Sequence, residues 1–249
     1  MANLPNKSFL INYNARDYND STHTIPKTSG QTFDEDLVLN APACAYTSDH
    51  ITVDGQYFQK YFSDANDNPF NLTAQDPFTI IAKTSKGLDA SGEHSIASVR
   101  SEYGGFSWML FNGGNGSDNN TVFMHNSERY ASNTPSITLT TEPNIWAIRI
   151  ANGSGYGESI TDNTTGTTQT VRYDGLSPDG FGIFTDTFQS TGFELWRGDF
   201  YWIYMSKEAL TDEEIAAVIN FNEGTVPPEP QGQLIVPNNN IFINGVRIV

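Results

Sequence analysis

The segment Phe193–Gly224, FELWRGDFYWIYMSKEALTDEEIAAVINFNEG, combines a strand pattern and a helix pattern in one short stretch. Residues 200–205 are all aromatic or aliphatic and contain no Gly or Pro, which is typical of a packed strand. Successive strand side chains point to opposite faces of a sheet. We therefore expect Phe200 and Trp202 on one face and Tyr201 on the other, unless a bulge intervenes.

The second half of the segment predicts a short helix that begins after Thr211. The Thr211 hydroxyl can accept from the backbone N–H of Glu214, and the Glu214 side chain can reach back to the N–H of Thr211, which makes a capping box. Gly224 suits a left-handed stop. The helix is short, so it needs a sheet beside it for stability. Its apolar stripe comprises Ile215, Val218 and Ile219.

This segment resembles the closing motif of laminin-G-like domains of the concanavalin A-like lectin/glucanase superfamily. The resemblance lies in Gly198-x-Phe200-x-x-Ile203-x-Met205 followed by Ala209-Leu-Thr-Asp-Glu-Glu-Ile215. PFTIIAK (77–83) and NIWAIRI (144–150) resemble two further strands of the family, which implies that Trp146 is a core residue. The superfamily includes lectins, glycosidases, adhesion modules and phage fibre parts, so the resemblance predicts a fold and does not select a function.

The rest of the chain predicts short strands separated by turn signals. Together with the closing motif they predict an all-β, two-sheet antiparallel jelly-roll sandwich of the concanavalin A type, with one short C-terminal helix and a β-type tail. The first strand is expected near the last. The expected strand segments are 8–14 (with Phe9, Ile11 and Tyr13 on one face), 43–62 (with a turn at Asp54-Gly55), 77–83, 94–100, 105–111, 121–125, 136–140, 144–150, 170–173, 181–184 and 200–205.

Three regions follow from this pattern. Residues 1–224 form the sandwich, residues 225–232 form a Pro-rich linker, and residues 233–249 form a hairpin-like segment with a tight-turn signal at Asn244-Gly245. The last segment is too small to bury a core. It either docks on the sandwich or pairs with other copies of the chain or another virion protein. We favour intermolecular docking, which predicts a homo-oligomer.

Composition limits the possible partners. The net charge is -16 at pH 7, and charged residues make up 17% of the 249-residue chain. Such a surface repels nucleic acid and anionic membranes, although the charge also serves solubility. The single cysteine, Cys44, cannot form an intrachain disulfide, and its small apolar neighbours predict a buried, inert thiol. The sequence shows neither a signal peptide nor a membrane span.

Catalytic motifs are absent. Glycosidases need two carboxylates across the scissile bond, and the E-[ILV]-D-x-x-E motif of the family's glucanases does not occur. Glu194 and Asp199 do not form a credible pair. The four histidines lack zinc-ligand spacing, and no G-x-S-x-G is present. We expect no enzymatic activity.

Four aromatic residues near loops rich in Asn and Gly are candidate platforms for sugar rings: Tyr103, Trp108, Trp196 and Tyr201. Aromatic faces stack on sugars while amides and carboxylates bind hydroxyls. For each of these residues taken singly, a place in the core or in an interface is favoured over a role as a sugar platform.

A second candidate site is the carboxylate–amide loop formed by Asp64, Asn66, Asp67 and Asn68. Its oxygens are the ligand type that calcium prefers. The loop lacks the glycine and terminal glutamate of an EF-hand, and the alternative is an ordinary Asn/Asp turn.

The sequence thus predicts a non-enzymatic surface, fibre or decoration protein of a phage virion whose lectin-like domain contacts bacterial surface glycans or proteins. It would be made in the host cytoplasm and be extracellular after lysis. The alternatives are a purely structural virion subunit and, below it, a polysaccharide-cleaving glycosidase.

Overall fold

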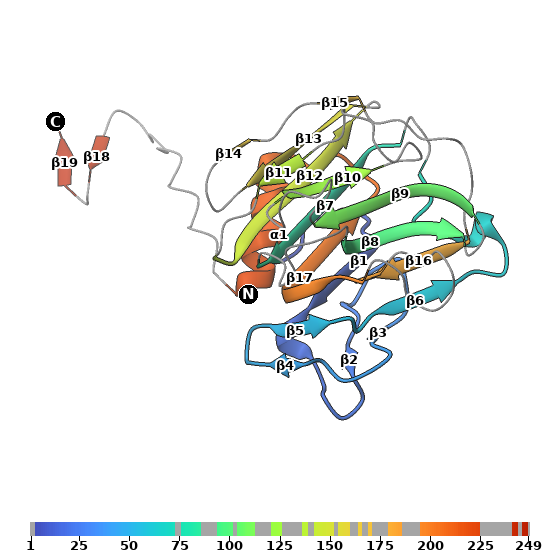
Figure 1. Ribbon diagram of the computed structural model, residues 1–249. Helices are drawn as coiled ribbons and strands as arrows, with labels where there is room; N and C mark the ends of the chain where they lie inside the picture. Colours follow the sequence, from blue (N-terminus) through green and yellow to red (C-terminus); the bar gives the residue numbers. More distant parts are fainter. Residues whose placement is uncertain are drawn as a thin grey trace.

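The computed structural model describes the backbone of residues 3–72, 76–85, 94–101, 104–112, 121–125, 136–138, 142–151, 154–159, 164–165, 169–170, 179–185, 195–224, 241–243 and 246–248. Side chains are described within residues 3–72, 76–85, 94–100, 142–151, 179–185 and 195–224. Within these ranges the chain is an all-β sandwich, as the sequence predicts, with one α-helix at its end (Figure 1).

The larger sheet has the described order β14-β13-β12-β7-β17-β5-β4, with β1 also paired to β17 and β15 to β13. All of its pairings are antiparallel. Its strands are β1 (Ile11–Asn14), β4 (Ala45–Tyr46), β5 (Ile51–Asp54), β7 (Phe78–Thr84), β12 (Asn144–Ala151), β13 (Ser154–Ser159), β14 (Thr164–Thr165), β15 (Gln169–Thr170) and β17 (Arg197–Ser206).

The smaller sheet has the order β11-β10-β9-β8-β16-β6 and is also antiparallel. Its strands are β6 (Phe58–Tyr61), β8 (His94–Ser101), β9 (Gly104–Asn112), β10 (Thr121–His125), β11 (Ser136–Thr138) and β16 (Gly180–Ile183). Outside the two sheets lie the pair β2 (Thr24–Ile25) and β3 (Leu37–Val38), the pair β18 (Ile241–Ile243) and β19 (Val246–Ile248), and the helices η1 (Ala15–Asp17), η2 (Ala65–Asp67) and α1 (Asp212–Glu223).

The main core lies between the sheets. Fully buried apolar side chains from β1, β7, β12 and β17 of the larger sheet meet those of β8 and β16 of the smaller sheet. Trp146 on β12 belongs to this core, as the resemblance implies, and its indole N–H donates to the Thr84 hydroxyl at 3.0 Å. β1 pairs with β17, which confirms that the first strand lies beside the last.

A bulge divides the side chains of β17 between two faces. The register against β7 shifts between Phe200 and Trp202. Phe200 and Ile203 point into the core between the sheets, whereas Tyr201 and Trp202 both belong to a second apolar cluster on the outer face. The alternation expected for an unbroken strand therefore does not hold at Trp202, because the bulge that the expectation excepted is present and inverts it.

A similar correction applies to β1. Ile11 and Tyr13 point into the main core as expected, but Phe9 lies in the outer cluster and stacks on Tyr204 at a ring distance of 5.6 Å. The strand begins at Ile11, so the period-two pattern does not extend back to Phe9.

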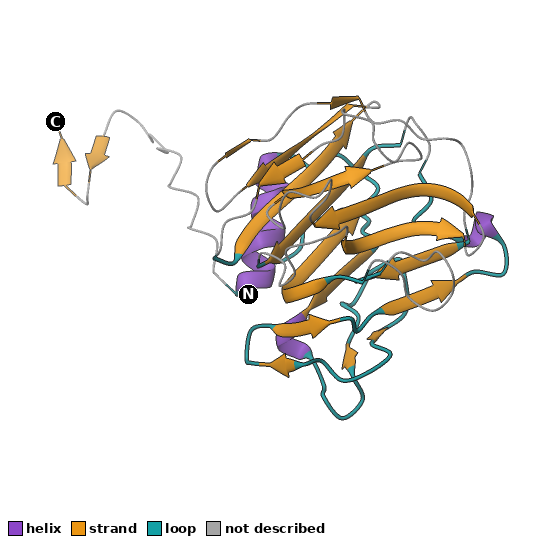
Figure 2. Cartoon of the chain, viewed as in Figure 1, coloured by secondary structure: helices purple, strands orange, loops and turns teal. Residues whose placement is uncertain are grey.

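The helix α1 covers the outer face of the larger sheet (Figure 2). It begins with the predicted capping box: the Thr211 hydroxyl accepts from Glu214 N at 3.3 Å, and Thr211 N donates to the Glu214 carboxylate at 2.8 Å. Gly224 ends it with φ 69. Ile215 and Val218 are buried against the sheet, and this packing stabilises a helix too short to persist alone. Among the described residues, no helix is long and apolar enough to cross a bilayer.

One loop prediction, the buried thiol of Cys44, needs correction, and another, the turn at Asp54-Gly55, is confirmed. Cys44 is exposed, because it precedes the edge strand β4, whose residues are both exposed; its sulfur lies 3.7 Å from the Gln56 amide nitrogen. Gly55 has the positive φ of a turn, at 92. However, the turn at Asp54-Gly55 joins β5 and β6, which belong to different sheets, so it is not a hairpin.

At the C-terminus, β18 and β19 pair antiparallel on either side of Asn244-Gly245, in agreement with the tight-turn prediction. The turn residues and the linker 225–232 lie outside the described residues, and the docking of 233–249 stays a prediction.

Gly198 shows why the closing motif contains a glycine. A Cβ at this position would lie 2.7 Å from the Trp196 indole ring. Trp196 is fully buried and stacks on Phe184 with ring centroids 5.4 Å apart, so the ring cannot move aside freely.

We predict that Gly198→Ala lowers the free energy of unfolding by about 1–3 kcal/mol, the usual effect of overpacking a core. Denaturant unfolding measures this loss. In a Trp196→Phe background, where the ring atoms that the new methyl group meets are removed, the same substitution should cost much less. Equal costs in both backgrounds would contradict the steric explanation.

Candidate functional site

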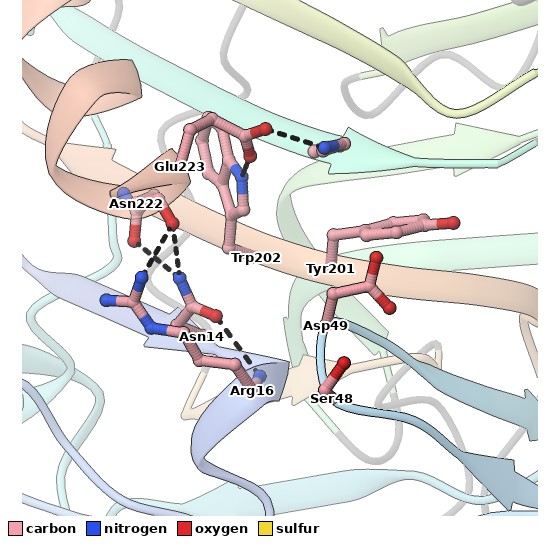
Figure 3. Close-up of a pocket in the computed structure, with 9 residues that line it drawn as sticks. Asn14, Arg16, Ser48, Asp49, Tyr201, Trp202, Asn222 and Glu223 are labelled. Carbon is pink, nitrogen blue, oxygen red and sulfur yellow. Dashed lines mark hydrogen bonds and ion pairs between the residues drawn. The ribbon is translucent and has the colours of Figure 1, made fainter. Parts of the chain in front are cut away.

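A cavity of about 260 Å³ lies beside the bulge of β17. One edge of β17 is shared by two strands: residues 197–200 pair with β5 and residues 202–205 pair with β1. Tyr201 falls between the two pairings, and the cavity opens there. Its lining is mostly polar and comprises Asn14, Arg16, Ser48, Asp49, Lys83, Tyr201, Trp202, Asn222 and Glu223 (Figure 3).

Glu223, in the last turn of α1, links the helix to the sheet. One carboxylate oxygen accepts from the Trp202 indole N–H at 2.6 Å, and the other lies 2.6 Å from the Lys83 ammonium. The Lys83 and Glu223 side chains are 21% and 23% exposed, so the ion pair is partly desolvated. Both carboxylate oxygens are therefore occupied by protein donors.

The opposite wall is a network of side-chain amides. Asn222, which is buried, donates to the Asn12 side-chain oxygen at 2.8 Å, and Asn14 donates to the Asn222 backbone carbonyl at 3.0 Å. A guanidinium nitrogen (Nη1) of Arg16 donates to the same carbonyl at 3.1 Å. Arg16 belongs to η1, which Asn14 caps by accepting from the Arg16 backbone N–H. This network satisfies carbonyl groups at the helix end that would otherwise lack partners.

Asp49 and Ser48 lie at the rim, in the turn between β4 and β5. One Asp49 carboxylate oxygen (Oδ1) accepts from the Thr47 hydroxyl at 2.6 Å and lies 2.8 Å from Nδ1 of His50. The hydrogen bond from Thr47, followed by the one from His50, lowers the pKa of Asp49. Asp49 is thus ionised near neutral pH and held in place by its neighbours.

Tyr201 forms the aromatic wall and is 7% exposed. The Lys83 ammonium lies 5.0 Å from its ring centroid, and the His50 ring lies at the same distance. Burial, assisted by nearby carboxylates, raises the pKa of Tyr201 to about 12. The phenol is therefore neutral at physiological pH.

Besides the Tyr201 hydroxyl, three polar groups of the lining have no protein partner within the described part of the chain. They are the Oδ2 atom of Asp49, the Ser48 hydroxyl and the Nη2 atom of Arg16. A carboxylate acceptor, a hydroxyl and a guanidinium donor beside an aromatic wall form a set that can bind a polyhydroxylated molecule.

The four aromatic candidates fall in different places. Tyr201 lines the cavity. Trp196 is fully buried in the main core and presents no face to a ligand. Trp108 lies on β9, where only the backbone is described, and Tyr103 lies outside the described residues. Of the two candidates whose side chains the structure describes, only Tyr201 lies at the cavity, and a glycan-binding role for it stays a prediction.

The predicted calcium loop forms a local turn. Asp64 caps η2, and one of its carboxylate oxygens accepts from the backbone and side-chain nitrogens of Asn66 at 2.9 and 2.8 Å. Asn68 is buried and donates to the Gly180 carbonyl at 3.2 Å, while Asp67 contributes its backbone N–H to the turn. Among the described residues, no group of three or more His, Cys, Asp or Glu side chains could hold a metal ion.

No sequence pattern indicated most of the lining residues. Asn14 ends β1, Arg16 lies in η1, Asp49 lies in a turn and Lys83 lies near the end of β7, so their spacings along the chain carry no common pattern. They meet because β17 pairs with both β1 and β5, and α1 returns over the same strands.

No family model and no curated protein sequence matches the chain. Solved structures do. A mutant of Trypanosoma rangeli sialidase displaying trans-sialidase activity has a TM-score of 0.59 at 13% identity, over 90% of this chain and 35% of that one. The botulinum neurotoxin serotype D binding domain has a TM-score of 0.52 at 11% identity, over 87% and 52%.

The CBM40 of Ruminococcus gnavus IT-sialidase, bound to alpha2,3 sialyllactose, has a TM-score of 0.41 at 15% identity, over 58% and 82% of the two chains, and carries no argument at that score. The other two likenesses show a shared β-sandwich fold. The chain spans about a third of the sialidase and about half of the toxin domain.

We predict that Glu223→Gln lowers the free energy of unfolding by about 1–3 kcal/mol in denaturant titrations, because the substitution leaves a partly buried ammonium without its counter-charge. Glu35→Gln is the matched control. Glu35 also lies 2.6 Å from a lysine, Lys60, but the side chains are 41% and 36% exposed, and such surface pairs contribute about 0–1 kcal/mol. Similar losses in both variants would contradict a special role for Glu223.

Proposed function

We propose that the chain is a non-enzymatic binding module that holds a glycan segment in the cavity beside Tyr201. The observation that carries the proposal is the combination, in one cavity of about 260 Å³, of an aromatic wall with three unpartnered polar groups on Asp49, Ser48 and Arg16. The size suits about one sugar unit and its linkage. The β-sandwich fold agrees with a binding role but does not select it.

The absence of catalysis is part of the proposal. A glycosidase needs a carboxylic acid that keeps its proton near neutral pH. The pKa of Asp49 is lowered rather than raised, and both carboxylate oxygens of Glu223 are occupied by Trp202 and Lys83. Asp49 is therefore suited to accepting hydrogen bonds from hydroxyl groups, and neither carboxylate that lines the cavity is suited to proton donation.

A role at the surface of a phage virion is a further part of the proposal. It rests on the sequence: a lectin-like closing motif, an acidic surface with few charged residues and an apolar C-terminal segment. Residues 233–249 would attach the sandwich to other copies or to another virion protein, leaving the cavity to contact bacterial surface glycans. The alternative is a structural virion subunit without sugar affinity.

The test is binding of the purified chain to a glycan array and to isolated bacterial polysaccharides, followed by titration of the best ligand. We expect saturable binding that weakens about tenfold or more in Asp49→Asn and Arg16→Gln, because each loses a charged hydrogen-bonding group. If both variants lose all binding while their unfolding curves stay unchanged, the result would most strongly support the cavity as the glycan-binding site.

Arg197→Gln is the matched control for Arg16→Gln. The two arginine side chains are 43% and 39% exposed, and each lies near one carboxylate, but Arg197 does not line the cavity. It should bind like the unmodified chain. Absence of binding to every glycan tested would contradict the proposal and favour the structural subunit.

A further inference from the structure

The charges of the cavity limit which glycans can enter it. Its lining contains two cations, Arg16 and Lys83, and two carboxylates, Asp49 and Glu223. A ligand that carries a negative charge would need a cation whose charge is not already balanced. The partners of Arg16 and Lys83 therefore determine whether an anionic ligand can bind in the cavity.

Both cations already have carboxylates beside them. The Lys83 ammonium lies 2.6 Å from Glu223, and the Arg16 guanidinium lies 4.0 Å from Asp17. The Lys83 ammonium also lies over the Tyr201 ring. An anionic ligand could pair with Lys83 only by breaking its partly desolvated ion pair with Glu223. Glu223 is also held by the hydrogen bond that it accepts from the Trp202 indole.

Further carboxylates surround the aromatic wall. The Asp199 and Glu142 carboxylates, like Asp49 and Glu223, disfavour a negative charge on the Tyr201 hydroxyl by Coulombic repulsion. The two cations and the two carboxylates of the lining balance, and Asp17, Asp199 and Glu142 add negative charge beside it. The cavity thus has an excess of negative charge around it, in keeping with the net charge of -16 on the whole chain.

We infer that the cavity selects uncharged or amine-bearing glycan segments and rejects those that carry carboxylate or sulfate groups. The inference rests on the proposed function and adds the ligand class to it. Asp49 would accept hydrogen bonds from hydroxyl or ammonium groups, and Arg16 would donate to a hydroxyl or ether oxygen. A carboxylate in the same place would face Asp49 and Glu223, and like charges placed together in a binding site weaken binding strongly.

An array that places each neutral oligosaccharide beside its carboxylated and amino-sugar counterparts tests this selection. We expect the best ligands to be neutral or amine-bearing, with the carboxylated counterparts at least about tenfold weaker. Added salt should reduce the difference. Glu142→Gln removes a charge near Tyr201 without changing the lining, so it should reduce the difference in affinity between neutral and carboxylated glycans. Asp54→Asn also removes one charge, but Asp54 is not among the carboxylates that raise the pKa of Tyr201, so this variant should leave the difference unchanged.

The outcomes separate the two proposals. If carboxylated glycans bind as well as their neutral counterparts, and Arg16→Gln abolishes that binding, the cavity is a glycan site and the charge selection is wrong. If the difference exists but Glu142→Gln and Asp54→Asn affect it equally, the selection belongs to the whole surface and not to the cavity. If no glycan binds, the proposed function fails and the inference fails with it.

Discussion

The bulge in β17 at Tyr201 is the constraint on which both faces of the larger sheet depend. After the bulge, Ile203 and Met205 point into the core between the sheets, while Trp202 and Tyr204 support α1 on the outer face. A strand without the extra residue would exchange these two sets, because a one-residue shift moves every side chain to the other face. The same irregularity separates the pairings to β5 and β1 and so opens the cavity.

Buried amides then fix the cavity wall. Asn222 is bonded to Asn12 and Asn14, which lie more than two hundred positions earlier in the chain. Buried polar groups are costly unless every partner is in place, so this network joins the end of α1 to the first strand in one arrangement. Glu223 adds a second connection to β7 and β17. A wall held this way loses little freedom when a ligand binds, which favours affinity.

The sequence predicted the fold well because the closing motif is local. The capping box, the glycine stop and the apolar strand depend on residues close in sequence, and all were confirmed. The bulge depends on pairing with β7, which is distant in sequence, so the alternation pattern of β17 could not reveal it. For the same reason the pattern assigned Trp202 to the wrong face. Cys44 was assigned to the core from its neighbours, whereas its exposure follows from the place of β4 at a sheet edge.

The candidate site could not be predicted in the same way, since Tyr201 is the one aromatic candidate with a described side chain that lines it. Its other lining residues come from β1, η1, the turn after β4, β7, β17 and α1, and only the tertiary structure brings these together. Because these side chains belong to this chain, the similar solved β-sandwiches give no information about its ligand. A fold fixes the path of the strands, whereas the charges on Arg16, Asp49, Lys83 and Glu223 belong to this chain. Ligand chemistry must therefore be argued from those charges and their partners, which carry the proposed preference for a glycan without acidic groups.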